Sequence, residues 1–400
     1  MSVAELSEPA TRAEWITPRH GPAWWGEEEQ AWVLTRYADV SALLRAPNYE
    51  VSEDIGGHLA RVAARAGRDY RQLSNLIGGV LFYRNPPFHP QGRKFLKRCL
   101  GVAQEPLRPE AITESARQVV DTALSRGRVD AVREIGTRIP LDALTRGLGL
   151  TYEAGETVLS SAHIIEIWRR GMSLRVLDGL QAEARRVDGM LRAEMDAAER
   201  TGAGNLAEIL AINRAEFGLA EDDVVALLFF LLLAGVETTS MLVSSAIFLL
   251  LANPGQGARF EADPGLINGV VDEALRYTPP VRRANHRVIA EPVEIGGRAF
   301  AAGDQVIGHI EQAHFDPAAY PDPVHFDIAR RGPPTAAFGF GAHACLGAAI
   351  ARQEGRAVLG VLFERARLGL VSERPQWQDH PVFRRLERLD VTLEPRDRSR

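Results

Sequence analysis

Hydrophobic residues recur with helical spacing along the first two thirds of the chain. Apolar positions three or four residues apart predict amphipathic helices over 40–44, 95–102, 112–124, 180–200 and 206–215. A longer helix is predicted over 224–252, and it opens with 13 consecutive apolar residues. That run is shorter than the roughly 20 apolar residues that span a bilayer, and Glu237 follows it directly. The pattern therefore predicts a buried helix of a soluble protein.

The pattern changes to short alternating runs after residue 281. The runs at 293–295 and 305–307 are separated by glycine-containing turns, and they predict small β-hairpins. Residues 32–34 are also apolar, and we expect them to form an edge strand of the same sheet. A minor β region therefore accompanies the predicted helices.

The last part of the chain begins with turns and ends with a helix. Five prolines between residues 316 and 334 predict a series of turns, and a final helix is predicted over 346–367. No repeat, low-complexity tract or linker interrupts the sequence. We therefore expect a single, mainly α-helical domain over residues 1–400, with a minor β region.

Composition and charge narrow the classes of protein that fit. The 47 Lys and Arg against 52 Asp and Glu give a formal net charge of −5, which favours neither a nucleic acid nor an anionic membrane as partner. The first 15 residues are polar and acidic, unlike a secretory signal. Two cysteines are too few for a disulfide framework. These features predict a cytoplasmic protein.

One of those cysteines, Cys345, lies in a glycine-rich segment with the sequence FGFGAHACLG, residues 338–347. Glycines let backbone N–H groups approach a sulfur, and the start of the following helix favours negative charge, so both effects favour a thiolate. Such a thiolate suits a nucleophile, a redox sensor or an axial metal ligand. His343 would be the base of a Cys-His hydrolase, although side chains two residues apart on a tight turn usually diverge. Cys99 provides no second metal ligand, because it stands alone in a basic amphipathic helix.

This segment resembles the ligand loop of the cytochromes P-450, Phe-Gly-x-Gly-x-His/Arg-x-Cys-x-Gly, at every specified position. The resemblance implies the P-450 fold, with a long central helix over haem b and the cysteine loop beneath it. It implies that the Cys345 thiolate binds the haem iron, which favours cleavage of the O–O bond. It further implies that His343 faces a haem propionate and that Phe338, Gly339 and Gly347 contact the cofactor.

The centre of the predicted long helix carries the sequence AGVETT, residues 234–239. Glycine and threonine weaken a regular helix, so we expect a local widening that leaves a groove for oxygen. From the residues alone, Glu237 is equally well a carboxylate that caps a helix or forms a salt bridge. The resemblance implies that Ala234 and Gly235 face the haem. It also implies that Glu237 delivers protons and that Thr238 stabilises the hydroperoxo intermediate, which favours dioxygen with reductive activation.

Glu273 and Arg276 are three residues apart and share one face of a predicted helix. An exposed pair of this kind would contribute only tenths of a kcal/mol. The resemblance implies instead a buried structural network, with Arg330 as a third member.

Three further residues match the propionate partners of the family. His89 and Arg93 are four residues apart, and Arg287 matches a third position. The chain departs from the usual bacterial pattern at Thr335, where many members have His, and at His314 and Phe315, which interrupt a common Ala-Asn-Arg-Asp run. Haem binding is still expected, with an altered outer shell.

Basic residues indicate an electron donor outside the chain. Five of them lie on the predicted helices that follow His89 and Cys345, where we expect the thiolate side of the haem: Lys94, Lys97, Arg98, Arg352 and Arg356. A basic face suits an acidic partner, which the resemblance implies to be a ferredoxin with its reductase. Ordinary solvated helix faces are the competing interpretation.

The substrate pocket is the least defined part of the sequence. Candidate lining residues are Leu81, Phe82, Trp168, Leu233, Val281 and Arg283, and the apolar ones fit a core position equally well. The pairs Arg282-Arg283 and Arg169-Arg170 suit a substrate carboxylate, a propionate or the surface.

The predicted function is that of a soluble bacterial haem-thiolate monooxygenase. It would oxidise a small organic substrate with dioxygen, in secondary metabolism or catabolism. The resemblance spans residues 85–370 and covers the first 80 only weakly. A haem-binding or sensory protein of the same fold without turnover is the alternative, and a thiol hydrolase comes third.

Overall fold

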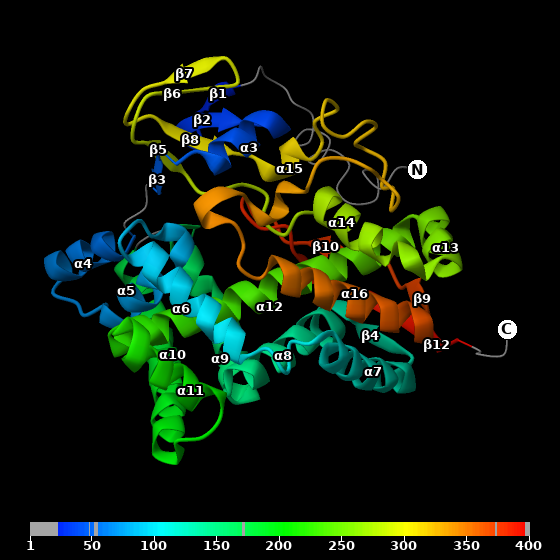
Figure 1. Ribbon diagram of the computed structural model, residues 1–400, viewed down its shortest axis with the longest axis horizontal. Coiled ribbons are helices and arrows are strands. Elements are labelled where there is room, and N and C mark those ends of the chain that lie inside the picture. The colour runs from blue at the N-terminus through cyan, green and yellow to red at the C-terminus, as the bar shows by residue number, and fades with distance from the viewer. Residues whose placement is uncertain (1–22, 48, 52–54, 170–172, 373, 397–400) are drawn as a thin grey trace. The chain divides into compact units, whose positions relative to one another are not determined.

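The computed structural model describes residues 23–47, 49–51, 55–169, 173–372 and 374–396 (Figure 1). The chain divides into two compact units. The first unit comprises Met1–Glu50, Pro109–Pro140 and Thr238–Arg400, and the second comprises Val51–Arg108 and Leu141–Glu237. Helix α12 (Glu221–Ala252) contributes its first half to the second unit and its second half to the first. That residues 1–400 form one domain stays a prediction.

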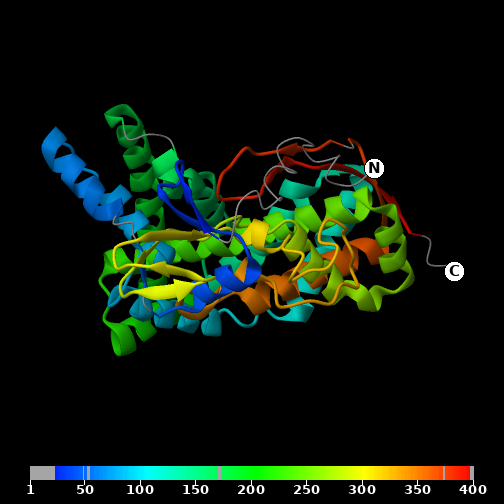
Figure 2. The same ribbon diagram turned by 90° about the horizontal axis from the view of Figure 1, so that it is seen from above.

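Helices α7, α13, α14 and α16 of the first unit share a core with the second half of α12, whereas α3 and α15 pack against each other. Helix α16 lies beside α7 and α14, as Figures 1 and 2 show. The helices are α3 (Tyr37–Arg45), α7 (Pro109–Arg126), α13 (Pro254–Ala262), α14 (Ile267–Tyr277), α15 (Ile310–Ala313) and α16 (Ala348–Arg365), with a π-helical turn η2 (Val132–Thr137) and the 3-10 turns η5 (Pro264–Leu266), η6 (Ala336–Phe338) and η7 (Gly341–His343).

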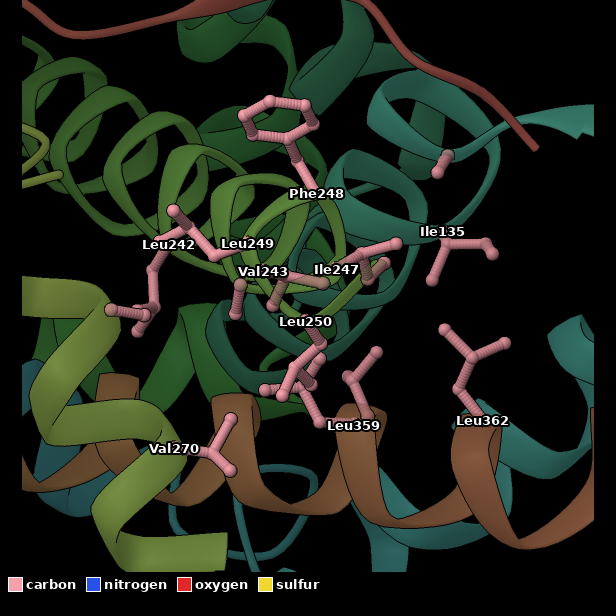
Figure 3. Packing of buried hydrophobic residues seen from close by; sticks show 14 of the residues in the cluster. Ile135, Leu242, Val243, Ile247, Phe248, Leu249, Leu250, Val270, Leu359 and Leu362 are labelled. Carbon is pink, nitrogen blue, oxygen red and sulfur yellow. The ribbon is translucent and has the colours of Figure 1, made fainter. Parts of the chain in front are cut away.

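The core of this unit forms around the second half of α12, in which residues 239–250 are all buried. Leu250 of α12 lies next to Leu359 of α16, whereas Phe248 points to the other side of α12 (Figure 3) and packs edge-on to Trp377. By length and composition α12 is the one described helix that could cross a membrane, with a mean hydropathy of 2.0 over its most apolar window. Within the protein, 72 % of that window is buried, as we predicted for a core helix.

A five-stranded sheet completes one side of the first unit. Its strand order is β1 (Ala23–Gly26), β2 (Ala31–Leu34), β8 (Gln305–Gly308), β5 (Arg287–Ile289) and β3 (Tyr49–Val51). Strand β2 pairs in parallel with β8, and β5 pairs antiparallel with β8. The prediction that residues 32–34 form an edge strand is wrong, because β1 pairs with β2 and covers that edge.

Three small sheets account for the other strands. β6 (Val293–Ile295) and β7 (Arg298–Phe300) form the predicted hairpin. Its two turn residues, Gly296 and Gly297, have φ of 62° and 79°, as a two-residue type I′ turn requires. The remaining strands are β4 (Arg128–Asp130), β12 (Asp390–Pro395) and β9 (Ala366–Leu370) in one sheet and β10 (Gln376–Trp377) and β11 (Leu386–Arg388) in another.

The second unit is helical. Helix α10 packs against α5, α9 and α11. On α10, Arg192 forms ion pairs with Asp188 and with Glu221 and Asp222 at the start of α12, which joins the two helices. The elements are α4 (Ile55–Ala66), α5 (Arg71–Gly78), η1 (Leu81–Tyr83), α6 (Phe88–Val102), α8 (Arg138–Leu148), α9 (Tyr152–Ser160), η3 (Ala162–Arg169), α10 (Leu174–Thr201), α11 (Asn205–Ile212) and η4 (Asn213–Phe217).

Candidate active site

The loop around Cys345 is closed by its own backbone. The Cys345 N–H donates to the Phe338 carbonyl oxygen at 2.8 Å. Gly339 and Gly341 have φ of 63° and 69°, and a Cβ on Gly341 would lie 2.5 Å from the Leu44 carbonyl oxygen. Both positions therefore require glycine. The Cys345 side chain is exposed in the chain by itself, so the loop presents this sulfur outward.

Helix α16 begins just after this loop. Its first residue is Ala348, two residues later than predicted, because Gly347 forms the N-cap. Arg352, one turn into the helix, places its Cζ 4.4 Å above the Phe338 ring and forms an ion pair with Asp272 at 2.9 Å. The start of α16 thus covers one side of the cysteine loop.

A buried cationic site lies in the same unit as this loop. The Cζ of Arg287 lies 4.2 Å from the centre of the Tyr49 ring, and that ring lies 6.3 Å from the ring of His343. Arg287 is 4 % exposed, and its Nε and Nη1 have no hydrogen-bond partner among the described residues. The Tyr49 hydroxyl is also buried, and it has no hydrogen-bond partner among the described residues.

The unpartnered donors of this site fit an anionic group. Burial lowers the pKa of Arg287, because the charged form loses its hydration, and burial raises the pKa of Tyr49. A buried guanidinium is stable only when an anion or several acceptors balance it. The donors present, one guanidinium and one phenol, suit a carboxylate such as a haem propionate. Sequence reasoning found Arg287 and His343 but missed Tyr49, since nothing in its local pattern distinguishes it from a core tyrosine.

One face of helix α12 is only partly buried. Most of its side chains are buried, whereas Phe230, Ala234, Gly235, Glu237 and Thr238 are half-buried and share one face at helical spacing. This face contains four of the five residues that the sequence singled out on this helix, whereas the fifth, Leu233, is buried.

The expected widening of α12 is not observed, because the helix is regular through residues 234–239. Gly235 serves packing instead. A Cβ at this position would lie 2.7 Å from Cδ2 of Leu144 on α8, so the glycine allows α8 to approach α12 closely. The prediction of a groove formed by a widened helix is therefore wrong.

A second carboxyl group lies behind Thr239. Glu354 on α16 is 4 % exposed, and the Thr239 hydroxyl donates to it. Burial raises the pKa of Glu354 to about 8, so this carboxyl holds its proton at neutral pH. Sequence reasoning missed Glu354, because its neighbours Gln353 and Arg356 give the segment the pattern of a solvated face.

Glu273, Arg276 and Arg330 lie together in a buried ion-pair network. Glu273 accepts hydrogen bonds from Arg276 at 2.7 and 2.8 Å and from Arg330 at 3.1 Å. Arg276 also donates to the His314 carbonyl oxygen at 2.9 Å. The imidazole Nε2 of His314 in turn accepts from the Ala336 N–H at 2.9 Å. Hydrogen bonds therefore run from Glu273 to η6, which precedes the cysteine loop.

The two departures from the family pattern form a helix cap. Burial lowers the pKa of His314 to about 3, so its neutral imidazole acts as an acceptor. Thr335 is the N-cap of η6, and its hydroxyl accepts from the Ala337 N–H at 3.1 Å. Phe315 packs edge-on to Tyr277. The Thr335 hydroxyl is thus engaged by the backbone of η6.

The other predicted residues belong mostly to the second unit. His89 is buried in the first turn of α6, and Arg93 follows one turn later, half-buried. Leu81 and Leu233 are buried. Phe82 packs edge-on against Phe230, with 5.6 Å between ring centres. The side chains of Trp168, Arg169 and Arg170 lie outside the described residues.

Two predicted pocket residues belong to the first unit. Val281 is half-buried and forms a β-bridge with Phe383, and Arg283 is also half-buried. Arg282 forms a buried ion pair with Glu311 at 2.6 Å. Glu311 already balances the charge of Arg282, which favours a structural role for this residue over the binding of a substrate carboxylate.

Known proteins resemble the chain over most of its length. The family model for Cytochrome P450 matches residues 265–386. Cytochrome P450 107B1 of Saccharopolyspora erythraea is 30 % identical over 373 residues, which cover 90 % of this chain and 89 % of that protein. The Epothilone C/D epoxidase of Sorangium cellulosum is 27 % identical, and the match covers 94 % of this chain and 90 % of that protein.

Solved structures confirm the predicted fold. The crystal structure of CalO2 has a TM-score of 0.81 at 25 % identity and covers 97 % of this chain and 96 % of its own. The epothilone D-bound P450epoK has a TM-score of 0.79 at 26 % identity, with coverage of 98 % and 96 %. Cytochrome P450 proteins bind haem b and catalyse monooxygenation. With a relative 30 % identical over nine tenths of its length, this chain belongs to the cytochrome P450 family and is a haem b monooxygenase of the soluble bacterial type.

Proposed function

We propose that Cys345 is the thiolate ligand of the haem iron and that the chain oxidises a small organic substrate with dioxygen in the cytoplasm. The cysteine loop carries this proposal, because its glycines hold Cys345 outward in the same unit as the unpartnered Arg287. Haem, when bound, supplies the activation of dioxygen from which one oxygen atom enters the substrate. Phe338, Gly339 and Gly347 shape the ligand loop.

We give Arg287 and His343 the role of binding a haem propionate. For His89 and Arg93 the same role is proposed from their match to the family pattern alone. On the half-buried face of α12, next to Ala234 and Gly235, the Glu237 carboxyl passes protons and the Thr238 hydroxyl donates a hydrogen bond during oxygen activation.

Replacement of the ligand tests the first part. Cys345→Ala removes the sulfur, so the ferrous carbonyl complex should lose the red-shifted band that a thiolate ligand produces. Cys99→Ala is the matched control, because that thiol is buried and burial raises its pKa to about 12. A red-shifted band that persists in Cys345→Ala would contradict the assignment.

The coupling of reductant consumption to product formation tests the role of Thr238. Thr238→Ala should leave reductant consumption running while the product formed per reductant falls several-fold. Ser245→Ala removes a buried hydroxyl two turns further along α12 and should leave the coupling unchanged. Equal coupling in both variants would contradict the role of the Thr238 hydroxyl in oxygen activation.

We propose a ferredoxin and its reductase as electron donors. The two lysines of the chain, Lys94 and Lys97, are both exposed on α6 and form no ion pair with any described residue. Arg98 and Arg352 are less suited, since Glu216 and Asp272 pair with them at 2.9 Å. A basic patch of this kind attracts an acidic partner.

A charge reversal tests the donor surface. Lys94→Glu/Lys97→Glu should lower ferredoxin-supported turnover at low salt about ten-fold, with less effect at high salt. Arg61→Glu/Arg65→Glu on α4 changes the net charge by the same amount and should leave turnover unchanged. Equal turnover of both double variants would contradict docking at α6.

The substrate is proposed to be an uncharged organic molecule of secondary metabolism or catabolism. Relatives include the Epothilone C/D epoxidase and the Mycinamicin IV hydroxylase/epoxidase, and the candidate lining residues of the second unit, Leu81, Phe82 and Leu233, are apolar. Arg283 stays a candidate at the pocket. Spectral titration with pairs of carboxylic acids and their amides should show tighter binding of the amides, whereas a preference for the acids would contradict this.

A further inference from the structure

Tyr49 and Arg287 lie next to each other because of the sheet order. Strand β3 carries Tyr49 and is the neighbour of β5, which carries Arg287, at one end of the five-stranded sheet. The guanidinium stacks on the face of the phenol ring, with Cζ 4.2 Å from the ring centre. This cation–π contact fixes the ring without using its hydroxyl.

The polar atoms of this pair need a partner. The Tyr49 hydroxyl and Arg287 Nε and Nη1 are all buried, and no described residue accepts a hydrogen bond from any of them. Each buried donor left in this state destabilises the folded protein, and a charged donor does so more strongly. Three unsatisfied donors on two adjacent side chains therefore indicate a ligand that accepts several hydrogen bonds and carries negative charge.

A single carboxylate meets this requirement. It has two oxygens and about four lone-pair sites, enough for a guanidinium and a phenol together. Burial raises the pKa of Tyr49, so the phenol keeps its proton and donates. His343, whose ring is 6.3 Å from that of Tyr49, places the same site beside the cysteine loop.

We propose that Tyr49 is a positioning residue of the haem site, whose hydroxyl donates a hydrogen bond to the propionate that Arg287 binds. The inference rests on the proposed haem ligation by Cys345. The Thr335 hydroxyl caps η6, whereas the Tyr49 hydroxyl on β3 has no such partner.

Tyr49→Phe tests this directly, since it keeps the ring that Arg287 stacks on and removes the hydroxyl alone. The holoenzyme variant should transfer its haem to excess apomyoglobin about ten-fold faster than the wild type. Its propionate bending band in the resonance Raman spectrum should shift, while the thiolate carbonyl band stays in place. Tyr70→Phe is the matched control, because that buried hydroxyl already donates to Asp178 at 2.9 Å.

A second measurement isolates the propionate. Reconstituted with haem dimethyl ester, in which both propionates are esterified, wild type and Tyr49→Phe should lose the cofactor at equal rates. A rate difference that persists with the ester, or equal rates with ordinary haem, would overturn the role of Tyr49. In either case, a thiolate band in the spectrum of the wild type would still support ligation of the haem iron by Cys345. The absence of that band from the wild type would refute the proposed ligation instead.

Discussion

At neutral pH the Glu354 carboxyl keeps its proton, because burial raises its pKa to about 8 although the Thr239 hydroxyl favours the charged form. The folded pKa lies above the unfolded value of 4.5, so the folded state binds one more proton between these values. Stability contributed by this group is therefore complete below the unfolded pKa and is lost as the pH rises toward 8.

Glu354→Gln should remove that dependence. Glutamine keeps the shape and stays neutral, so the free energy of unfolding of the variant should fall less steeply from about pH 5 to about pH 8, by at most about 1.4 kcal/mol per pH unit. Urea unfolding across this range measures the slope. Glu364→Gln, at an exposed position of the same helix, should keep the slope of the wild type; identical slopes in all three proteins would show that Glu354 is charged.

A glycine allows two helices, α5 and α12, to pack closely against each other. Gly79 follows α5, and a Cβ there would lie 2.4 Å from the Ala226 Cβ and 2.6 Å from its backbone carbon on α12. Backbone atoms inside a packed helix cannot move aside, so the contact between α5 and α12 requires glycine at this position.

Gly79→Ala should therefore lower the free energy of unfolding by about 1–3 kcal/mol, as overpacking does. The adjacent Gly78→Ala places its Cβ in open space and should be neutral or stabilising by a few tenths of a kcal/mol, because alanine favours a helix. Thermal unfolding followed by circular dichroism compares the two. Similar Tm values for both variants would contradict the close approach of α5 to α12.

Elements with a continuous pattern could be predicted from the sequence, and contacts between distant segments could not. The apolar pattern alone predicts the helix over 224–252, and the observed helix begins only three residues earlier. The sequence predicts an edge strand at 32–34, because nothing in residues 23–26 indicates that they pair with it. Tyr49 and Glu354 were missed since their roles depend on Arg287 and Thr239, far away in the sequence.

At the scale of the whole molecule, one carboxylate joins segments that are far apart along the chain. Glu273 binds Arg276 within α14 and Arg330 in the turns before the cysteine loop, and it accepts from the Asp327 N–H at 2.9 Å. Arg276 is 2 % exposed and extends the network to the His314 carbonyl. Water cannot replace Glu273 at such depth.

Glu273→Gln leaves the guanidiniums of Arg276 and Arg330 without a carboxylate, and loss of one partner from a buried ion pair costs about 3–5 kcal/mol. We expect the urea midpoint to fall accordingly. Glu261→Gln makes the same chemical change where Glu261 pairs with Arg396 and is 42 % exposed, so it should cost less than about 1 kcal/mol. Because hydrogen bonds lead from Glu273 through His314 to η6, the Glu273 variant should also release haem faster, whereas equal midpoints for the two variants would refute the buried network as a determinant of stability.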